Sequence, residues 1–292
     1  MAANLAYSDF LFPQVLPPVV YHYTSHTGLL GIVKSGSIWA TNIRYLNDAR
    51  ELDLAVDILR EVLNYRRAFA AGWQLKVIRL LEQKWLARIF PDSTIYVFTC
   101  SFSEKGDLLS QWRGYAPPGA GYAVGFKPSL LRKAAGKQGF IFGRCIYDHE
   151  TQFAAVEEVV DNHLGLATGQ PPIPAVGDWE DRLAFLLFTR FFARAPLIKD
   201  ASFAEEREWR LIGSPITRFR YEFPPIEHRT SGSLIVTYVS VALGKSDTIP
   251  LHEIVVGPTP HSKLARNSLI QFLRSQKVRV RVWRSAAPFR QL

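Results

Sequence analysis

The stretch FAEEREWRLIG (203–213) holds the residue types best suited to chemistry in this sequence. Successive side chains of a β-strand point to opposite faces, so Glu206, Glu208 and Arg210 would share one face, opposite Trp209. Two carboxylates held in a cleft can stabilise a cationic transition state or exchange protons with a substrate. The same alternation also fits a solvent-exposed edge strand with ion pairs, and both interpretations remain open.

Polar residues also end two predicted strands in VVYHYTSHTGLLGIVKSGSIWATNIRYLNDARE (19–51). His22, Tyr23 and Thr24 close the first strand, and the second strand, at 37–45, runs into an Asn-Asp pair. Binding and catalytic groups are commonly carried where regular elements give way to loops. The two strand ends therefore indicate a candidate site.

A third polar stretch, SFSEKGDLLSQWRGYA (101–116), joins a predicted strand to a short predicted helix. Ser101 and Ser103 lie at the strand end, and Asp107 lies near the helix start. Small polar groups beside a helix N-terminus can bind an anion. They can equally cap a solvated helix, so the sequence leaves both interpretations open.

Composition favours a globular, basic, cytoplasmic protein. The 292 residues are 48% hydrophobic and 13% aromatic, enough for one large domain or two closely packed ones. No signal peptide and no apolar run long enough to span a bilayer is evident. Cys100 and Cys145 lie in strand-like runs and are expected to be buried free thiols. His22 and His26 are four apart, but a strand end separates them and no HExxH or CxxC motif is present, so no metal is expected.

The formal net charge of +9 is unevenly distributed, because no acidic residue follows Glu253. The basic residues beyond it are Lys263, Arg266, Arg274, Lys277, Arg279, Arg281, Arg284 and Arg290. Such a region can face the phosphates of a nucleic acid or a dinucleotide. It can also be a solvated helix beside an edge strand protected by arginines.

Hydrophobic periodicity predicts a mixed α and β chain. Strands are predicted at 19–24, 37–45, 93–103, 121–127, 139–148, 208–213, 216–223, 233–243, 252–258 and 278–285. Helices are predicted at 27–35, 49–70, 74–90, 106–116, 149–165, 179–195 and 262–276. Since strands come from both halves, we expect a single α+β domain over 1–292, with mainly antiparallel central sheets flanked by helices and a helical insertion around 149–200.

Several of these segments together resemble a known family. The chain is similar to the large bacterial family called domain of unknown function 2971, and the resemblance covers nearly the whole chain in order. The segments that carry it are His22-Tyr23-Thr24, Trp39 to Asp48, Ser103 to Tyr115, Gly121 to Phe126, Lys199 to Arg210, Ile254 to Pro258 and Ser285 to Arg290. The family name does not specify a function.

The order of elements also resembles the ADP-ribosyltransferase fold, including the toxin branch acting on nucleic acid and the branch that removes RNA 2′-phosphates. This resemblance implies that His22 orients the ribose of NAD and that Tyr45, with Asn47 nearby, packs on nicotinamide. It implies Glu208 as the catalytic residue and Glu206 as its support. The sequence departs from the better-known groups, with His-Tyr-Thr in place of His-Gly-[Ser/Thr] and without a G-x-Y-F motif.

The resemblance implies an NAD-dependent transferase of bacterial defence or toxin type, with a nucleic acid or protein acceptor. A fixed carboxylate would stabilise the oxocarbenium-like ribose, a contribution of roughly 3–4 kcal/mol per group. Glu208→Gln would then abolish nicotinamide release without affecting folding. The catalytic candidates are Glu208, Glu206 and His22. The cofactor-binding candidates are His22, Tyr23, Thr24, Arg44, Tyr45, Asn47, Ser103, Arg113, Tyr115 and Arg210.

Two other functions remain open on the sequence. One is a non-catalytic module of a bacterial defence or regulatory system that binds a nucleotide, or binds nucleic acid through the basic C-terminal region. The other is a hydrolase of a phosphorylated small molecule or RNA that uses the same residues. An enzyme would depend on Glu208, whereas a binding module would depend on the terminal arginines. We expect one concave pocket lined by His22, Tyr45, Ser103, Arg113, Glu208 and Arg210.

Overall fold

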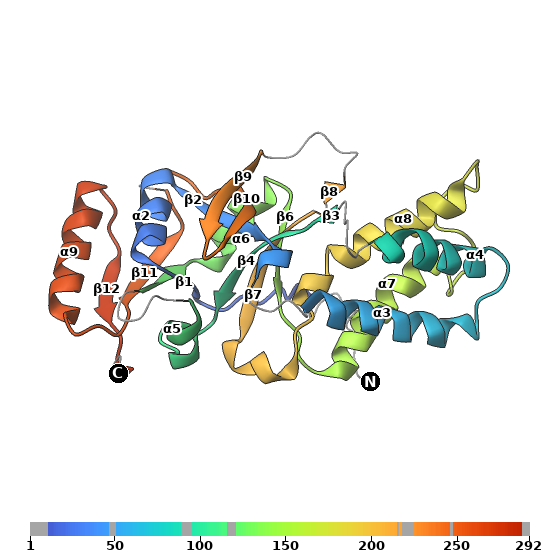
Figure 1. Cartoon of the computed structure of the whole chain (residues 1–292), viewed down its shortest axis with the longest axis horizontal. Helices are drawn as coiled ribbons and strands as arrows, with labels where there is room; N and C mark the ends of the chain where they lie inside the picture. The colour runs from blue at the N-terminus through green and yellow to red at the C-terminus, as the bar shows by residue number, and fades with distance from the viewer. Residues whose placement is uncertain are drawn as a thin grey trace.

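The computed structural model describes residues 11–46, 51–88, 95–115, 121–214, 216–217, 225–245 and 248–287. These residues form an α+β fold built on one large sheet, whose described strand pairs are antiparallel except for the last two strands of the chain. Helices flank the sheet (Figure 1), so the mixed, mainly antiparallel fold class expected from the sequence is confirmed.

The elements follow the order strand, helix, strand that the N-terminal pattern predicts. The strands of the large sheet are β1 (Val20–Thr24), β2 (Ser37–Asn42), β4 (Phe98–Ser103), β5 (Tyr122–Phe126), β6 (Phe140–Arg144), β7 (Glu208–Gly213), β9 (Ile226–Ser231), β10 (Leu234–Ala242), β11 (Leu251–Val256) and β12 (Arg281–Arg284). A separate pair contains β3 (Ile95–Tyr96) and β8 (Ile216–Thr217).

The helices include four long ones that lie apart from the sheet. The α-helices are α2 (His26–Ser35), α3 (Glu51–Arg67), α4 (Trp73–Leu80), α5 (Leu109–Tyr115), α6 (Pro128–Gly136), α7 (His149–Leu164), α8 (Trp179–Phe192) and α9 (Ser262–Ser275). Shorter helical turns are η1 (Ile43–Tyr45), η2 (Leu81–Trp85), η3 (Leu86–Arg88), η4 (Ala195–Leu197) and η5 (Ala201–Glu206).

The large sheet divides at β4. On one edge of β4, Phe98 and Thr99 pair with β2, whereas Ser103 pairs with β1. Between these ladders, the backbone of residues 100–102 has no partner on that edge among the described strands. The opposite edge of β4 pairs continuously with β7. The strands β1 and β2, which α2 connects, therefore diverge from one shared strand and leave a gap between them.

The sequence of β4, FTCSFS, suits a strand with one apolar and one polar face. Phe98, Cys100 and Phe102 alternate into the apolar core of the sheet. Thr99 and Ser103, with Ser101 between them, occupy the other face. Because these three side chains are small, they leave space above the sheet on that side, and their hydroxyl groups make the space polar.

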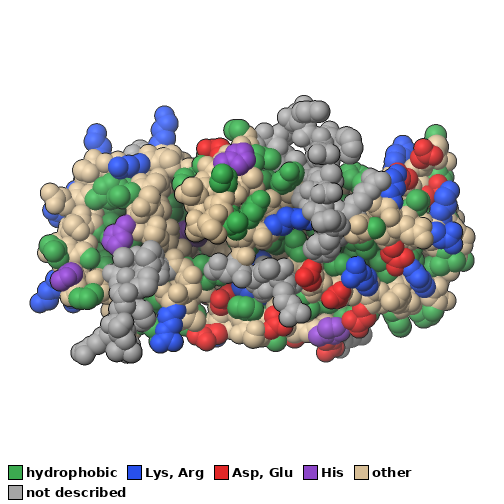
Figure 2. Space-filling view, viewed as in Figure 1, with side chains coloured by type: hydrophobic (Ala, Val, Ile, Leu, Met, Phe, Trp, Pro, Cys, Tyr) green, Lys and Arg blue, Asp and Glu red, His purple; other side chains and the backbone are tan. Residues whose placement is uncertain are grey.

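Two apolar clusters separate the molecule into a sheet region and a helical region. The first cluster lies between the sheet and α2, α6 and α9. The second joins α3, α4, α7 and α8, which form the right-hand end of the molecule in Figure 1. On the face shown in Figure 2, acidic and basic side chains are intermingled at this helical end.

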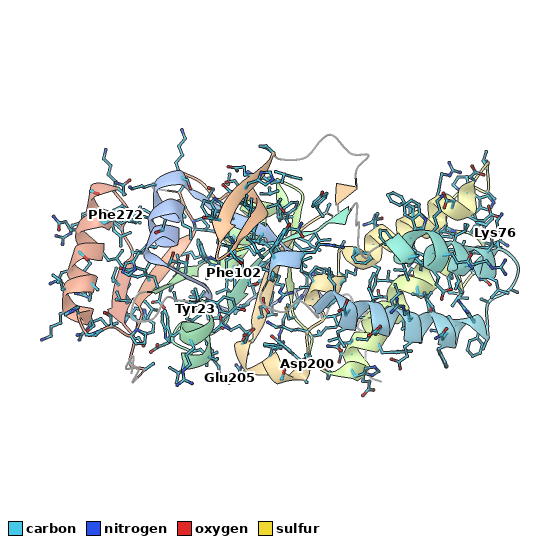
Figure 3. The ribbon with its side chains drawn as sticks, viewed as in Figure 1. Tyr23, Lys76, Phe102, Asp200, Glu205 and Phe272 are labelled. Atoms are coloured by element: carbon cyan, nitrogen blue, oxygen red, sulfur yellow. The ribbon has the colours of Figure 1, made fainter. Side chains whose placement is uncertain are left out.

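Ion pairs connect the segment 149–200 to α3 and α4. Arg66 on α3 donates through Nε and Nη2 to the two carboxylate oxygens of Asp161 on α7, both at 2.6 Å. Lys76 on α4, at the far helical end in Figure 3, lies 2.9 Å from Glu180 on α8. The predicted insertion thus shares its core with residues of α3 and α4, and the division of the chain into domains remains a prediction.

Most predicted elements are present, and two were not anticipated. The sequence analysis did not anticipate α6 or β9. The strand β9 is an edge strand with exposed residues at nearly every position, so its sequence shows no apolar alternation. The expected strand 216–223 lies mostly outside the described residues, as do Asn47 and Asp48. Cys100 and Cys145 are buried thiols, as expected. No helix among the described residues is both long and apolar enough to cross a membrane.

The C-terminal end of α2 gives a direct test of the fold. Gly36 has φ +66° and its N–H donates to the Ile32 carbonyl oxygen at 2.9 Å. An added Cβ would lie 1.9 Å from the carbonyl oxygen of Gly244. We expect Gly36→Ala to lower the free energy of unfolding by about 2 kcal/mol or more, since left-handed strain adds to the clash. Urea unfolding measures the change.

Gly31, in the same helix, is the matched control because an added Cβ there meets no atom within 4 Å. Gly31→Ala should be neutral or should stabilise the protein by up to about 1 kcal/mol, the difference in helix propensity. Equal effects of the two substitutions would contradict the described end of α2.

Candidate active site

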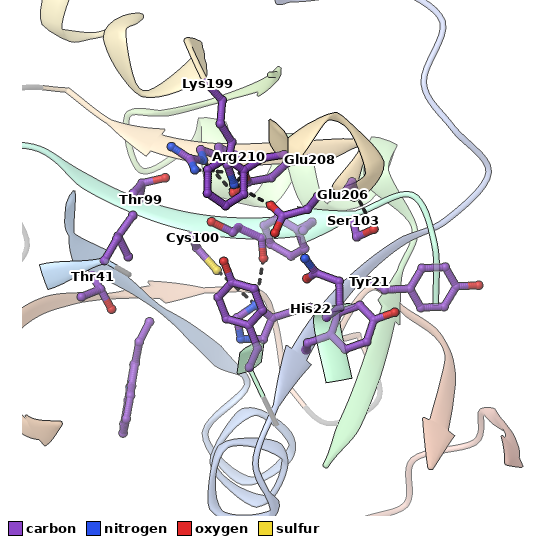
Figure 4. A pocket seen from close by; sticks show the side chains of 18 of the residues that line it. Tyr21, His22, Thr41, Thr99, Cys100, Ser103, Lys199, Glu206, Glu208 and Arg210 are labelled. Atoms are coloured by element: carbon purple, nitrogen blue, oxygen red, sulfur yellow. Dashed lines mark hydrogen bonds and ion pairs between the residues drawn. The ribbon is translucent and has the colours of Figure 1, made fainter. Parts of the chain in front are cut away.

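A cavity of about 260 Å³ opens where β1 and β2 diverge from β4 (Figure 4). Its walls come from β1, β2, β4, β7 and β9, from η1 and η5, and from α5. The aromatic rings that line it include those of Trp39, Tyr45 and Tyr115, which are exposed. The combination of rings with a few placed polar groups is typical of small-molecule sites.

The cavity brings together most of the residues expected from the sequence. The lining includes His22, Tyr23, Tyr45, Ser103, Tyr115, Glu206, Glu208 and Arg210. Arg44 and Arg113 are exposed and do not line it. Thr24 does not line it either, and its side chain lies against Gly28 of α2. Asn47 lies outside the described residues.

His22 lies at the gap between β1 and β2. Its Nδ1 is 3.0 Å from the carbonyl oxygen of Ser101, in the stretch of β4 that lacks a strand partner on this edge. A carbonyl oxygen only accepts, so Nδ1 carries the proton. Burial lowers the pKa of His22, and the bond to Ser101 opposes this shift. The ring is therefore neutral near pH 7, and its Nε2 is a hydrogen-bond acceptor.

Glu208 is buried at the base of the cavity between two cations. Its Oε1 accepts from Arg210 Nε at 2.7 Å, and its Oε2 accepts from Lys199 Nζ at 2.6 Å and Arg210 Nη2 at 2.9 Å. Burial alone would raise the pKa of Glu208, but Arg210 and Lys199 outweigh it and lower the pKa to about 2. Both carboxylate oxygens are thus occupied, and a solvent-exposed edge, one of the two interpretations of this strand, is wrong.

Glu206 differs from Glu208 in its surroundings. Its side chain is 13% exposed, compared with 4% for Glu208. Its Oε2 accepts from Lys199 Nζ at 2.5 Å, and no hydrogen bond to Oε1 is found among the described residues. Burial raises the pKa of Glu206, although Lys199 opposes the shift. Of the two carboxylates, Glu206 is the one with an oxygen available to a ligand.

Lys199 was not among the residues singled out from the sequence, although it begins the K-x-x-x-F-x-x-E-x-E-W-R motif. Its side chain is 2% exposed, and its Nζ lies 4.7 Å from the centroid of the Phe203 ring. The motif thus places one lysine against a ring and two carboxylates. The spacing of Lys199, Glu206 and Glu208 in this motif was the signal in the sequence that could have revealed the contact. Alternation of side chains along one strand does not account for that spacing.

Two expected ligand-binding hydroxyl groups have structural partners. The Tyr23 hydroxyl donates to the Lys105 carbonyl oxygen at 2.7 Å and accepts from the Leu108 N–H at 3.0 Å. The Ser103 hydroxyl donates to the Glu206 carbonyl oxygen at 2.7 Å. These groups fix the walls of the cavity, since each ties a strand to a neighbouring loop or turn.

The stretch 101–116 does not form an anion-binding corner at Asp107. The Asp107 carboxylate accepts from Trp112 Nε1 at 2.7 Å and from the Ser285 hydroxyl and Ala286 N–H at 2.5 and 2.8 Å. A carboxylate with three donors repels a further anion from this position. Asp107 instead joins α5 to the segment after β12. It thereby connects two of the motifs that resemble the family, Ser103 to Tyr115 and Ser285 to Arg290.

A second hollow, here called the arginine groove, lies between α9 and β12. The basic residues that line it are Arg266, Arg274, Arg279, Arg281 and Arg284. Arg266 Nε donates to the Val282 carbonyl oxygen at 3.0 Å, so this arginine partly covers the backbone of β12. The contact of Arg266 with the edge strand agrees with the protective interpretation of the basic C-terminal region, and the phosphate-facing interpretation stays a prediction.

A comparison with known families finds a match for the central segment of the chain. Residues 111–211 match the family described as "Protein of unknown function (DUF2971)". The family resemblance is confirmed over this segment. It includes the motif that ends at Arg210.

No curated protein matches the chain in sequence. Among solved structures, Thermus sp. 2.9 DarT in complex with ADP-ribosylated ssDNA is similar at 10% identity and a TM-score of 0.31. The alignment covers 93% of this chain and 95% of that chain.

The surroundings of Glu208 change what its substitution should do. We expect Glu208→Gln to lower the free energy of unfolding by about 3–5 kcal/mol at neutral pH, because the buried cations Lys199 and Arg210 would lose the carboxylate that both of them contact. The folded-state pKa lies at about 2, below the ordinary 4.5. The stabilisation is therefore fully present above the ordinary pKa and is lost as pH falls through the folded-state value.

Chemical unfolding of the wild type and Glu208→Gln between pH 2 and pH 7 measures this effect. The exposed Glu205 gives the control Glu205→Gln, which should keep both the stability and its dependence on pH. Wild-type stability of Glu208→Gln across this range would show that the buried ion pairs do not stabilise the fold.

Proposed function

We propose that the cavity binds NAD and that the protein is an ADP-ribosyltransferase-like enzyme of bacterial defence or toxin type, acting on a nucleic acid or protein. One observation carries the proposal: a neutral His22, held by a strand backbone, shares a cavity with the Glu206 carboxylate. Their order along the chain, with β1, α2 and β2 before a late carboxylate, agrees with the order that the fold resemblance implies.

The cavity suits part of a dinucleotide. Sites that enclose a drug-sized ligand have volumes of roughly 300–1,000 Å³. At about 260 Å³, this one would enclose a nucleoside-sized portion of NAD and leave the rest at the mouth. The rings of Tyr45 and Tyr115, each 40% exposed, offer surfaces for a planar nicotinamide.

NAD would supply a bond between ribose and nicotinamide whose cleavage leaves positive charge on the ribose and sends the bonding electrons to nicotinamide. His22 Nε2 would accept a hydrogen bond from a ribose hydroxyl and so orient the sugar. Glu206 Oε1 would stabilise the positive charge and then take the proton from the attacking acceptor group. Its raised pKa favours proton uptake, and Lys199 fixes the carboxylate through Oε2.

This proposal gives the reacting role to Glu206 and a positioning role to Glu208. The Glu208 carboxylate has three donors on its two oxygens, so a ribose hydroxyl would have to displace one of them. Its contribution is to balance the charges of Lys199 and Arg210 at the base of the cavity.

We expect Glu206→Gln to reduce nicotinamide release from NAD about 100-fold or more, because the amide keeps the shape but loses the charge that stabilises the ribose cation. The assay measures nicotinamide with bacterial nucleic acid and protein supplied as acceptors. The stability of Glu206→Gln should fall far less than that of Glu208→Gln, since Lys199 keeps its bond to Glu208.

Glu205→Gln is the matched control and should release nicotinamide at the wild-type rate. If the wild type releases no nicotinamide with any acceptor and calorimetry detects no NAD binding, the transferase proposal fails. A fully active Glu206→Gln would instead reject only the role given to this residue.

The alternative is a non-catalytic module that binds nucleic acid, and the arginine groove favours it. The five arginines have no acidic residue among the other residues that line the groove. Arg274, Arg279, Arg281 and Arg284 are exposed. Guanidinium groups that line a groove can contact a phosphate backbone and release its counterions.

We expect single-stranded nucleic acid to be retarded in a gel by the wild type at low salt and not at high salt. Replacing both Arg274 and Arg279 with Gln should weaken binding and reduce the magnitude of the slope of log affinity against log salt by about 1.4, the value for two lost contacts with a single strand. The control replaces Arg132 and Lys133 of α6, which are exposed outside the groove. Absence of any shift, or equal weakening by both double variants, would remove the groove as a nucleic-acid site.

A further inference from the structure

The wall of the cavity formed by β2, β4 and β9 contains a cation that was not anticipated from the sequence. Arg229 on β9 lines the cavity, and its guanidinium carbon lies 5.8 Å from the centroid of the Trp39 ring. Its Nη2 donates to the Thr41 hydroxyl at 3.2 Å. Among the described residues no carboxylate forms a salt bridge with Arg229. Its neighbour Glu227 accepts instead from the Tyr238 hydroxyl at 3.0 Å.

Two buried polar atoms in this wall have no hydrogen-bond partner among the described residues. They are Arg229 Nε and Thr99 Oγ1. Buried polar groups are nearly always satisfied, because an unpaired group costs roughly 1–3 kcal/mol. Thr99 is 1% exposed but lines the cavity, so a partner for its hydroxyl has to come from inside the cavity.

The strand register places these groups close together. Thr41 on β2 lies directly opposite Thr99 on β4, and side chains of opposed residues share one face of a sheet about 5 Å apart. Arg229 reaches across β10 to Thr41. The Arg229 guanidinium and the Thr99 hydroxyl thus present two donors to the same part of the cavity. Trp39, two residues before Thr41 on the same face, adds a ring that is 45% exposed.

We propose that this wall is a second subsite, in which Arg229 and Thr99 bind a phosphate group of a nucleotide while Trp39 packs against its base. The proposal rests on the nucleotide-binding function given to the cavity and assigns the phosphate-bearing half of the ligand. An anion supplies the acceptor that both orphaned donors lack, and it neutralises a partly buried guanidinium. The rings of Tyr45 and Tyr115 then remain for the other half.

The alternative is that Arg229 only packs on Trp39. A cation–π contact of this kind satisfies the ring but leaves Nε and the Thr99 hydroxyl unpaired. It also gives no reason for a hydroxyl at position 99. A valine has nearly the same shape and would remove the unpaired group at no cost to a ligand-free fold.

Calorimetric titration of the wild type with ADP, inorganic pyrophosphate and adenosine tests the subsite. We expect Arg229→Gln to weaken ADP and pyrophosphate binding about tenfold or more, the effect of losing a charged hydrogen bond. Adenosine binding should change much less. Trp39→Ala should weaken ADP and adenosine, and Arg132→Gln on the surface should change none of them.

Thr99→Val separates a ligand role from a structural one. It should weaken ADP binding several-fold while leaving the melting temperature equal to or above that of the wild type. A loss of stability without a loss of ADP affinity would assign Thr99 to the fold. Failure of the wild type to bind ADP, or wild-type affinity in Arg229→Gln, would overturn the subsite.

The same titrations distinguish this proposal from the transferase reaction. ADP binding that depends on Arg229, in a protein that never releases nicotinamide, would support the subsite and reject the reaction. Nicotinamide release that Arg229→Gln leaves unchanged in both rate and KM for NAD would support the reaction and overturn the subsite.

Discussion

The arrangement of the cavity depends on the buried ion pairs of Glu208 with Lys199 and Arg210. Removing a carboxylate from water costs several kcal/mol, and only close, well-oriented cations offset this cost. The network extends through the backbone: Arg210 Nη1 donates to the Pro196 carbonyl oxygen at 2.7 Å, and the Glu208 N–H donates to the Tyr147 hydroxyl at 2.8 Å. Charge neutralisation therefore fixes β7 against the helical region and sets the base of the cavity.

The second constraint is the division of the sheet at β4. A strand that pairs with two diverging neighbours leaves backbone groups without a ladder partner between them, and such groups must be satisfied elsewhere. His22 supplies one donor, to Ser101, and its tautomer and charge follow from that bond. The small hydroxyl side chains of β4 leave room for the cavity, and Lys199 and Arg210 at its base are positively charged. Fold and site thus arise from the same local features.

Much of this fold could be predicted from the sequence, and part of the site could not. The apolar alternation of β4 and the capping residues Ser25 and Gly36 give the elements, because these are local signals. The roles of Glu206 and Glu208 depend on a turn that alternation cannot reveal. Arg207 adopts φ +44°, which ends η5 and separates the two carboxylates that one continuous strand would have placed alike. Arg229 escaped notice because its exposed edge strand lacks an apolar pattern and its partners are far away in the sequence.

The polar residues of the cavity fall into two groups, those whose hydrogen bonds hold the walls in place and those with groups available to a ligand. The charged residues of the Lys199 to Arg210 motif largely bind one another, and Tyr23 and Ser103 bind loops, so these groups hold the walls in place. A ligand gains most binding energy from donors and acceptors that have no hydrogen-bond partner within the protein, since no internal hydrogen bond must be broken when the ligand binds. Among the described residues of this cavity, such groups include those of His22, Glu206, Thr99 and Arg229. They lie on both sides of the gap in the sheet, so a ligand that satisfies all of them must bridge β1 and β9 and close the division that β4 creates.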